Sequence, residues 1–122
     1  MECIFCKILD NAIPSYKIYE DDMVMAFLDI NPITPGHTLV IPKVHTLDIS
    51  TISDDLLLHI VGVSKEIANT LVTKLGANGF SLAQNNGCAQ DVKHFHMHVI
   101  PRYEKEFKLD IEDVYKKITH QE

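Results

Sequence analysis

Hydrophobic residues between Ser53 and Leu75 recur at intervals of three and four, which is the spacing of one face of an α-helix. Ser53 can cap the first turn, Asp54 and Asp55 suit the positive end of the helix dipole, and Gly76 can adopt the left-handed conformation that ends a helix. The pattern predicts one long helix between these bounds. Its buried stripe is expected to contain Leu57, Ile60, Val61, Ile67, Ala68, Leu71, Val72 and Leu75.

The other hydrophobic runs are short, and several alternate with polar residues as β-strands do. Asp21 and Asp22 separate the first two runs, which indicates a hairpin, and a short helix is expected after Asp110. Short strands around one long helix are typical of an α+β domain with an antiparallel sheet, and we expect residues 1–122 to form one such domain. The candidate strands are residues 16–20, 23–29, 37–41, 80–84 and 94–100.

The composition is that of an ordinary globular domain, since 46% of the 122 residues are hydrophobic and 23% are charged. The formal net charge of -6 argues against a broad basic surface, so neither nucleic acid nor an anionic membrane is an expected partner. No apolar run approaches the ~18 residues of a membrane span. Glu2 stands where a secretory signal has basic residues, and we therefore expect a cytoplasmic protein.

Three histidines alternate with apolar residues near the end of the chain. In a strand, this period of two places all three imidazoles on one face and the apolar side chains on the other, where they can pack against the long helix. A single histidine is usually an ordinary surface residue, but three on one face indicate a functional site. The histidines are His94, His96 and His98, and the apolar residues are Phe95, Met97 and Val99.

Alternating histidines are compatible with two chemistries. Neutral imidazoles can bind a metal ion, but a catalytic metal site usually also has a carboxylate or a further histidine close by, and no Asp or Glu lies within this segment. The other chemistry is nucleophilic catalysis, in which one neutral imidazole attacks phosphorus while its neighbours orient it or donate protons. Nucleophilic catalysis fits a cluster without acids. A metal site built from the histidines instead predicts an activity that chelators abolish.

The segment His94-Phe95-His96-Met97-His98-Val99 resembles the His-x-His-x-His-x motif of the histidine triad (HIT) family of nucleotide hydrolases and transferases. The resemblance extends from Cys3 to Tyr103. It implies a five-stranded antiparallel sheet with one long helix and short terminal helices, paired edge to edge with a second copy in a homodimer. Each subunit would bind one purine nucleotide. The other matching segments are residues 27–32, 35–43, 85–87 and 101–102.

The resemblance also implies hydrolysis or transfer at the α-phosphate of a nucleoside phosphoramidate or a dinucleoside polyphosphate, through a nucleotidyl-histidine intermediate. His96 matches the family's nucleophile, and we expect its ring to be uncharged and open to a pocket. His98 matches the histidine that contacts the phosphate, and His94 and His37 match those that support the cluster. The implied nucleotide-binding residues are Asp29 at the ribose and Asn85 and Gln90 near the phosphate.

One position departs from the family pattern. Many members carry Ser or Thr just before the position of Val92, where this chain has Asp91. A carboxylate cannot donate a hydrogen bond, and it repels a bound phosphate if it points into the site; alternatively, it turns outward and caps the turn. The departure adds weight to an alternative function, which is a nucleotide-binding regulatory or scaffolding protein with weak incidental hydrolysis.

Cys3 and Cys6 are spaced as two ligands of one metal ion. A reducing cytosol disfavours a disulfide, so the pair indicates a metal or redox site. By resemblance, His45 and His94 complete a Cys2His2 set, and a set with no open position implies structural zinc. The alternative is two buried free thiols with His45 at the surface. Cys88 is interpreted as an inert small residue.

Overall fold

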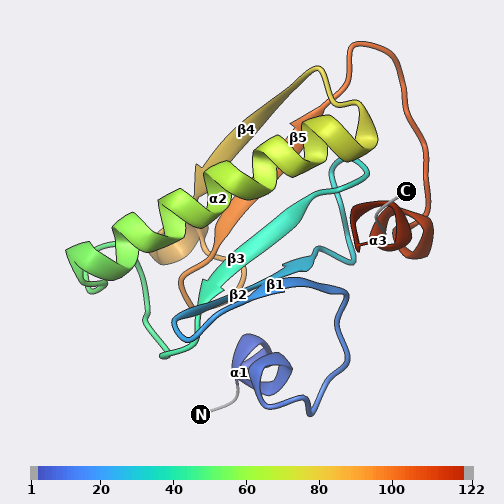
Figure 1. Cartoon of the computed structure of the whole chain (residues 1–122). Helices are drawn as coiled ribbons and strands as arrows, with labels where there is room; N and C mark the ends of the chain where they lie inside the picture. The colour runs from blue at the N-terminus through green and yellow to red at the C-terminus, as the bar shows by residue number, and fades with distance from the viewer. Residues whose placement is uncertain (1–2, 120–122) are drawn as a thin grey trace.

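The computed structural model describes residues 3–119, which form one five-stranded antiparallel sheet with three α-helices (Figure 1). The strand order is β1-β2-β3-β5-β4, so β1 and β4 are the edges of the described sheet. This architecture confirms the predicted α+β fold with one long helix and short terminal helices. The elements are α1 (Ile4–Leu9), β1 (Lys17–Glu20), β2 (Val24–Leu28), β3 (Thr38–Pro42), α2 (Asp54–Leu75), β4 (Gly79–Gln84), the 3-10 helix η1 (Gly87–Ala89), β5 (Met97–Arg102) and α3 (Ile111–Thr119).

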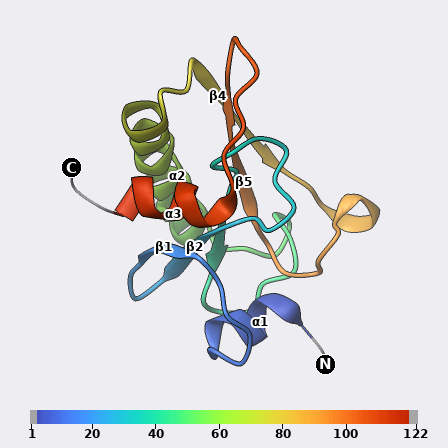
Figure 2. The same ribbon diagram turned by 90° about the vertical axis from the view of Figure 1, so that its right-hand side faces the viewer.

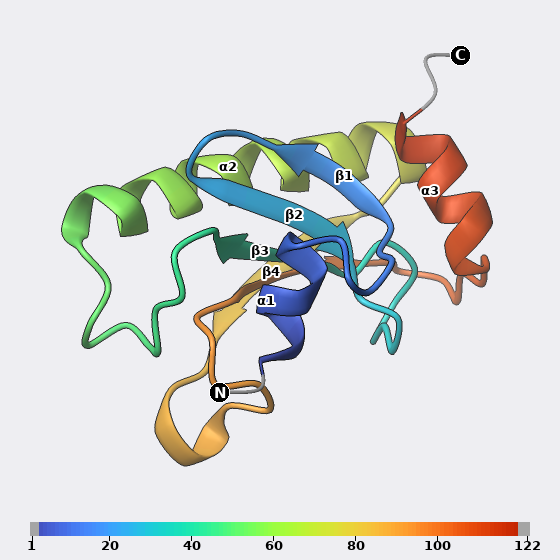
Figure 3. The ribbon, with the colours of Figure 1, turned by 90° about the horizontal axis from the view of Figure 1, so that it is seen from below.

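The long helix α2 covers one face of the sheet, and α1 lies against the other face (Figure 2 and Figure 3). Both predicted caps are present: Ser53 accepts a hydrogen bond from the Leu56 amide at 3.3 Å, and Gly76 ends the helix with a φ of 74°. Val61 and Val72 are exposed, contrary to expectation, because they lie roughly 80° and 100° from the centre of the buried stripe. That stripe is Ile60, Val63, Ser64, Ile67, Ala68, Leu71 and Leu75.

By length and composition, α2 is also the one described helix that could cross a membrane. Its buried side packs on the sheet, and its outer side carries Lys65 and Glu66. This amphipathic arrangement is that of a core helix.

The two faces of the sheet carry separate hydrophobic clusters, because successive residues of a strand point to opposite sides. Val24, Ala26 and Leu28 of β2 lie under α2, whereas Met25 and Phe27 lie toward α1. The α1-side cluster is therefore continuous from helix to sheet. It consists of Cys3, Phe5, Ile8, Met25, Phe27, Leu39 and Ile41.

The predicted strand 94–100 differs from the observed one, since β5 begins at Met97. Further pairing of β5 with β3 would bring Phe95 opposite Pro42, which has no N–H to donate. The Phe95 amide donates instead to the carbonyl of Thr46 at 2.6 Å. The first three residues of the predicted strand therefore precede β5 and are held by the loop after β3. The other predicted strands are observed with their ends shifted by about one residue.

Candidate functional site

The histidine segment keeps its predicted two faces although part of it precedes β5. Its three apolar residues belong to the cluster under α2. On the other side of the sheet, the rings of His94 and His96 contact Phe5 of α1. The alternating pattern therefore brings the imidazoles together on the α1 face.

His96 has one ring nitrogen fixed and the other free. Its Nδ1 lies 2.8 Å from the backbone carbonyl oxygen of His94. A carbonyl only accepts hydrogen bonds, so Nδ1 carries the proton and the neutral ring has its lone pair at Nε2. No described residue bonds to Nε2, and Nε2 is not among the fully enclosed polar atoms without a partner. Nε2 is therefore the nitrogen that a ligand can reach.

The structure corrects the expectation of an open His96 ring, because this side chain is only 3% exposed. Phe5 covers one side, with the ring centroids 5.1 Å apart and the planes at 80°. His98 lies on another side, with its centroid 4.9 Å away. Access is thus confined to a small part of the ring, which is compatible with attack through one nitrogen.

His37 and His98 form a directional pair beside His96. The amide of Ile33 donates to Nδ1 of His37 at 3.1 Å, so His37 carries its proton on Nε2. That proton is donated to Nδ1 of His98 over 2.9 Å, which leaves the proton of His98 on its own Nε2. Burial lowers the pKa of both rings below the ordinary value of 6.5, and the charge of Asp29, which raises both values, only partly opposes it. The pair is therefore neutral at pH 7, with one N–H left for a ligand.

Asp29 directly follows β2 and lies next to this pair. Its Oδ1 accepts a hydrogen bond from the Asn31 amide at 2.9 Å, and its Oδ2 lies 3.7 Å from Nε2 of His37. Because the His37 proton is directed to His98, Oδ2 keeps acceptor capacity, and the side chain is 20% exposed. A carboxylate in this position can accept hydrogen bonds from a ligand's hydroxyl groups.

The two predicted phosphate-side amides differ in environment. Asn85 follows β4 and is exposed, and the register of β4 with β5 places it next to His96. Gln90 is buried, and its Nε2 donates to the carbonyl of Leu47 at 2.7 Å. The Oε1 of Gln90 is enclosed and has no partner among the described residues. Gln90 therefore links the segment before the histidines to the loop after β3.

Asp91 is exposed on the segment that leads to the histidines. Its negative charge raises the pKa of His98, against the larger effect of burial, which lowers it. The carboxylate forms no hydrogen bond with any described residue, so the capping role considered from the sequence is not observed in this part of the chain. Its charge instead acts on His98.

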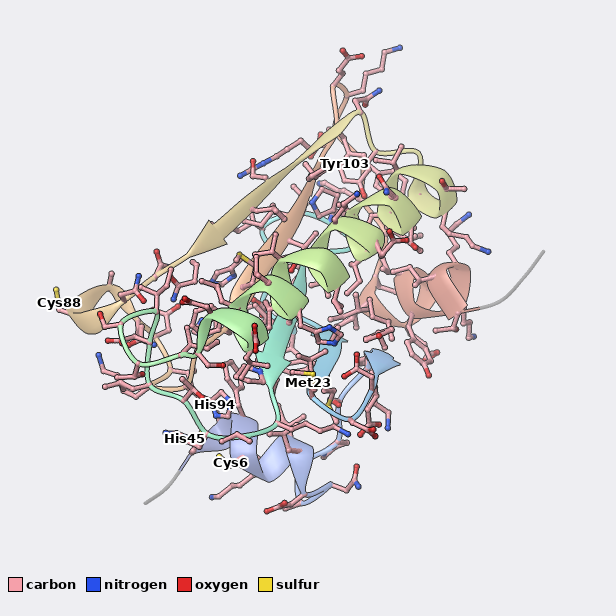
Figure 4. The ribbon with its side chains drawn as sticks, turned by 60° about the vertical axis from the view of Figure 1, so that its left-hand side comes forward. Cys6, Met23, His45, Cys88, His94 and Tyr103 are labelled. Atoms are coloured by element: carbon pink, nitrogen blue, oxygen red, sulfur yellow. The ribbon has the colours of Figure 1, made fainter. Side chains whose placement is uncertain are left out.

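A second cluster lies at the start of α1, where Cys6, His45 and His94 converge (Figure 4). The Sγ of Cys6 is 3.3 Å from Nδ1 of His45 and 3.6 Å from Nδ1 of His94, and the Sγ of Cys3 is 3.4 Å from Nδ1 of His94. Tetrahedral zinc with ordinary Zn–S and Zn–N bonds places S and N ligands about 3.6 Å apart. The four residues therefore fit one zinc ion.

The hydrogen bonds of this cluster also suit a metal. Nε2 of His94 donates to the carbonyl of Pro42 at 2.9 Å, so the lone pair of the ring is on Nδ1, toward the two sulfurs. Without a metal, burial and the neighbouring Cys3 raise the pKa of Cys6 to about 11, so metal binding must displace a proton from its thiol. Cys88, also free, is exposed and lies apart from the cluster (Figure 4).

The three triad histidines do not converge on one ion. Nδ1 of His94 faces the cysteines, Nδ1 of His96 faces a carbonyl, and Nδ1 of His98 faces His37. Asp29, His37 and His98 have ligand-type atoms within 4.8 Å of one another, but Nε2 of His37 already carries a proton for His98. The geometry therefore favours nucleophilic chemistry over a metal site built from the triad.

The family model of the HIT domain matches residues 10–105. The chain belongs to the HIT family. Its HIT domain is 46% identical over 109 residues to an uncharacterized HIT-like protein of Borreliella burgdorferi, covering 86% of this chain and 78% of that protein. It is 38% identical over 113 residues to the adenosine 5'-monophosphoramidase of Schizosaccharomyces pombe, covering 91% of this chain and 82% of that protein. Membership places the chain in a family of nucleotide hydrolases and transferases, as the histidine motif predicted.

A solved structure of a zinc-bound histidine triad family protein from Mycobacterium smegmatis has the same fold. Its TM-score is 0.91 at 36% identity, over 98% of this chain and 91% of that one. The zinc-bound relative and the geometry of the Cys2His2 cluster together support the predicted structural zinc in this HIT domain. The alternative of two free thiols with an uninvolved His45 is thereby set aside.

Four supporting groups of the site were not identified from the sequence. They are the amide of Ile33, the carbonyls of Pro42 and His94, and the ring of Phe5. Backbone groups carry no residue-specific signal, so the first three could not have been found. The position of Phe5 between two cysteines was the only signal for the fourth.

Proposed function

We propose that this HIT domain is a nucleotidyl hydrolase or transferase that acts at the α-phosphate of purine nucleoside phosphoramidates or dinucleoside polyphosphates. The observation that carries the proposal is the lone pair of His96, which the bond from Nδ1 to the His94 carbonyl assigns to Nε2. The similarity to a monophosphoramidase supports the phosphoramidate class.

In the first step, Nε2 of His96 attacks the α-phosphorus, a phosphorus–nitrogen bond forms and the bond to the leaving group breaks. The ring becomes an imidazolium that keeps its Nδ1 proton, which the carbonyl of His94 stabilises. The Nε2–H of His98 donates a hydrogen bond to a phosphate oxygen, and the departing group takes its proton from water. In the second step, water attacks phosphorus and the phosphorus–nitrogen bond breaks. The proton of that water passes to solvent, the nucleoside monophosphate leaves, and neutral His96 is restored.

The proposed nucleotide contacts follow from the same arrangement. Oδ2 of Asp29 accepts from the ribose hydroxyls, and the exposed amide of Asn85 donates to a phosphate oxygen. Gln90 supports this side of the site through the loop that it binds, since its Nε2 donates to the carbonyl of Leu47. The zinc cluster holds α1 and His94 in place and takes no part in bond cleavage.

We also propose a cytoplasmic homodimer. Cys3 and Cys6 are free thiols, which a reducing compartment maintains. Strand β4 pairs only with β5 in the described sheet, and its side chains Phe80 and Leu82 are 43% and 42% exposed. An unpaired edge with exposed apolar residues is suited to pairing with a second copy. Light scattering of wild type and of a Leu82→Lys variant tests this association, and a monomeric wild type would refute it.

A second candidate is a nucleotide-binding regulatory protein with incidental hydrolysis. The enclosure of His96 and the charge of Asp91 near His98 favour it. The two candidates differ in turnover, because an ordinary enzyme reaches a kcat of about 1 s⁻¹ or more. Far slower turnover of all adenylylated substrates beside tight AMP binding would support the regulatory function.

The decisive experiment replaces His96 by Asn and follows adenosine phosphoramidate cleavage and AMP binding. We expect turnover to be lost and AMP binding to be retained, and mass spectrometry of quenched wild type to show AMP attached to His96. His59→Asn is the matched control, because His59 lies on α2 and bonds to Asp21 outside the site. Unchanged turnover in His96→Asn would refute the mechanism.

A further inference from the structure

Helix α1 connects the metal-ligand cluster to the histidine face. Cys3 immediately precedes the helix and Cys6 lies in its first turn, with the Cys6 amide donating to Sγ of Cys3 at 3.4 Å. Phe5 lies between the two cysteines and is only 6% exposed. Successive residues of a helix point about 100° apart, so one turn directs ligands to the metal cluster and Phe5 to the sheet.

The ring of Phe5 restricts the motion of His96. Its edge-to-face contact with His96, at 5.1 Å, is accompanied by a similar contact with His94 at 5.8 Å, and Phe27 supports it from β2 at 5.6 Å. Close packing of this kind leaves an imidazole little room to rotate. A half-turn of the His96 ring would exchange Nδ1 with a carbon, break the bond to the His94 carbonyl and move the lone pair of Nε2.

The same ligand cluster also fixes the acceptor of that bond. The ring of His94 is held between Pro42, which accepts from Nε2, and the two sulfurs, which face Nδ1. His94 therefore has its side chain in the metal site and its backbone carbonyl on His96. Both constraints on His96, the carbonyl and the ring of Phe5, originate in residues that the cluster holds.

We propose that Phe5 is a positioning residue for His96, and that the cluster of Cys3, Cys6, His45 and His94 holds Phe5 in position. Metal occupancy then governs the orientation of an imidazole that does not itself bind metal. The catalytic consequence rests on the proposed function, whereas the orientation of His96 can be measured without substrate.

The test uses nitrogen-15 NMR of the histidine side chains in zinc-loaded, nucleotide-free protein, with His96 assigned through His96→Asn. Wild type is expected to show His96 as one tautomer, protonated at Nδ1. Phe5→Leu should retain about one zinc per chain yet average the two His96 tautomers, with kcat lowered about tenfold and KM changed by less than about threefold. Phe5→Tyr keeps a ring and should keep one tautomer. Ile8 lies in the same helix and in the same hydrophobic cluster as Phe5, so Ile8→Val is the control and should match wild type.

Several results would overturn the proposal. These are a single tautomer with full kcat in Phe5→Leu, loss of zinc from Phe5→Leu, and a single tautomer in metal-free Cys6→Ser. The second would mean that Phe5 acts only by holding the metal, and the third that the cluster does not control His96. If wild type turns over no substrate while Phe5→Leu still averages the tautomers, the proposed function fails and the positioning role stands.

Discussion

Nε2 of His37 lies 2.9 Å from Nδ1 of His98, and the amide of Ile33 occupies the other nitrogen of His37. The hydrogen bonds therefore run in one direction, from a backbone amide through two neutral rings. They end at Nε2 of His98, which carries a proton without carrying a charge. Nε2 of His98 is therefore a neutral hydrogen-bond donor for a phosphate oxygen. No described lysine or arginine forms a hydrogen bond with either ring.

Removing His37, the middle group of this series of hydrogen bonds, should impair the reaction more than nucleotide binding. In His37→Asn, Nδ1 of His98 loses its donor and the tautomer of His98 is no longer fixed. We expect kcat to fall about 10- to 100-fold with little change in KM, which is less than loss of a direct general acid costs. Steady-state kinetics against the His59→Asn control measures this, and equal kcat in the two variants would contradict it.

The histidine pair should also make stability depend on pH. Burial lowers the pKa of His37 and His98 in the folded state below the ordinary 6.5, so the unfolded chain takes up protons first as pH falls. Stability is then complete above about pH 6.5 and declines as pH falls further. Urea unfolding at pH 7.5 and 5.5, in the same zinc concentration, should show a smaller decline in His98→Asn than in wild type. Parallel declines would show that the pair does not contribute.

The local patterns were sufficient to predict the five strands, α2 and α3, whereas α1 was expected only from the family resemblance. The contacts between these elements were not predicted by the patterns. The period of two in the histidine segment correctly separated its two faces, and Ser53 and Gly76 correctly bounded α2. In contrast, the start of β5 at Met97 depends on Pro42, more than fifty positions earlier in the chain.

Enclosure of the candidate site was likewise beyond the sequence. The resemblance implied that Cys3 and His94, 91 positions apart, lie together, and they meet at 3.4 Å. It did not show that the same approach brings Phe5 onto His96. Whether Gln90 points to a ligand or to the Leu47 carbonyl depends on how two loops pack. Such contacts follow from tertiary packing, which residue spacing does not encode.

Asp21 should be the main polar determinant of stability in the β1–β2 hairpin. Its Oδ1 accepts from the amides of Met23 and Val24 at 2.8 and 2.9 Å, and its Oδ2 accepts from Tyr19 and His59 at 2.7 Å each. Burial would raise the pKa of Asp21, but these hydrogen bonds lower it overall. Asp21→Ala should cost about 1–3 kcal/mol of unfolding free energy.

Asp22→Ala, at the exposed neighbouring position, is the control for this prediction and should change stability by less than about 0.5 kcal/mol. Chemical denaturation of both variants at pH 7 gives the comparison. Equal stability of the two would mean that the four hydrogen bonds of Asp21 are replaced by water without cost.

Metal removal should unfold the N-terminal part of the site before the rest. Cys6→Ser is expected to lose zinc and at least about 2.7 kcal/mol of stability, the value for free zinc at 100 times its Kd. Cys88→Ser changes the exposed cysteine outside the cluster and should keep zinc and stability. Metal analysis and urea unfolding test both variants, and zinc retained by Cys6→Ser would refute the ligand assignment.

The charge of Asp91 should influence which leaving groups are accepted. A carboxylate whose field reaches His98 opposes a polyphosphate leaving group, which is anionic, more than an amine leaving group. Asp91→Asn should therefore raise kcat/KM for diadenosine polyphosphates relative to adenosine phosphoramidates by about 5- to 10-fold, as removal of one nearby charge does. It should also lower the pKa of His98, because a nearby negative charge is lost.

The control for this prediction is Glu66→Gln, which removes an equal charge from the far side of the sheet, where α2 lies. It should leave the ratio of the two kcat/KM values unchanged. Equal ratios in wild type and Asp91→Asn would mean that the carboxylate does not face the departing group.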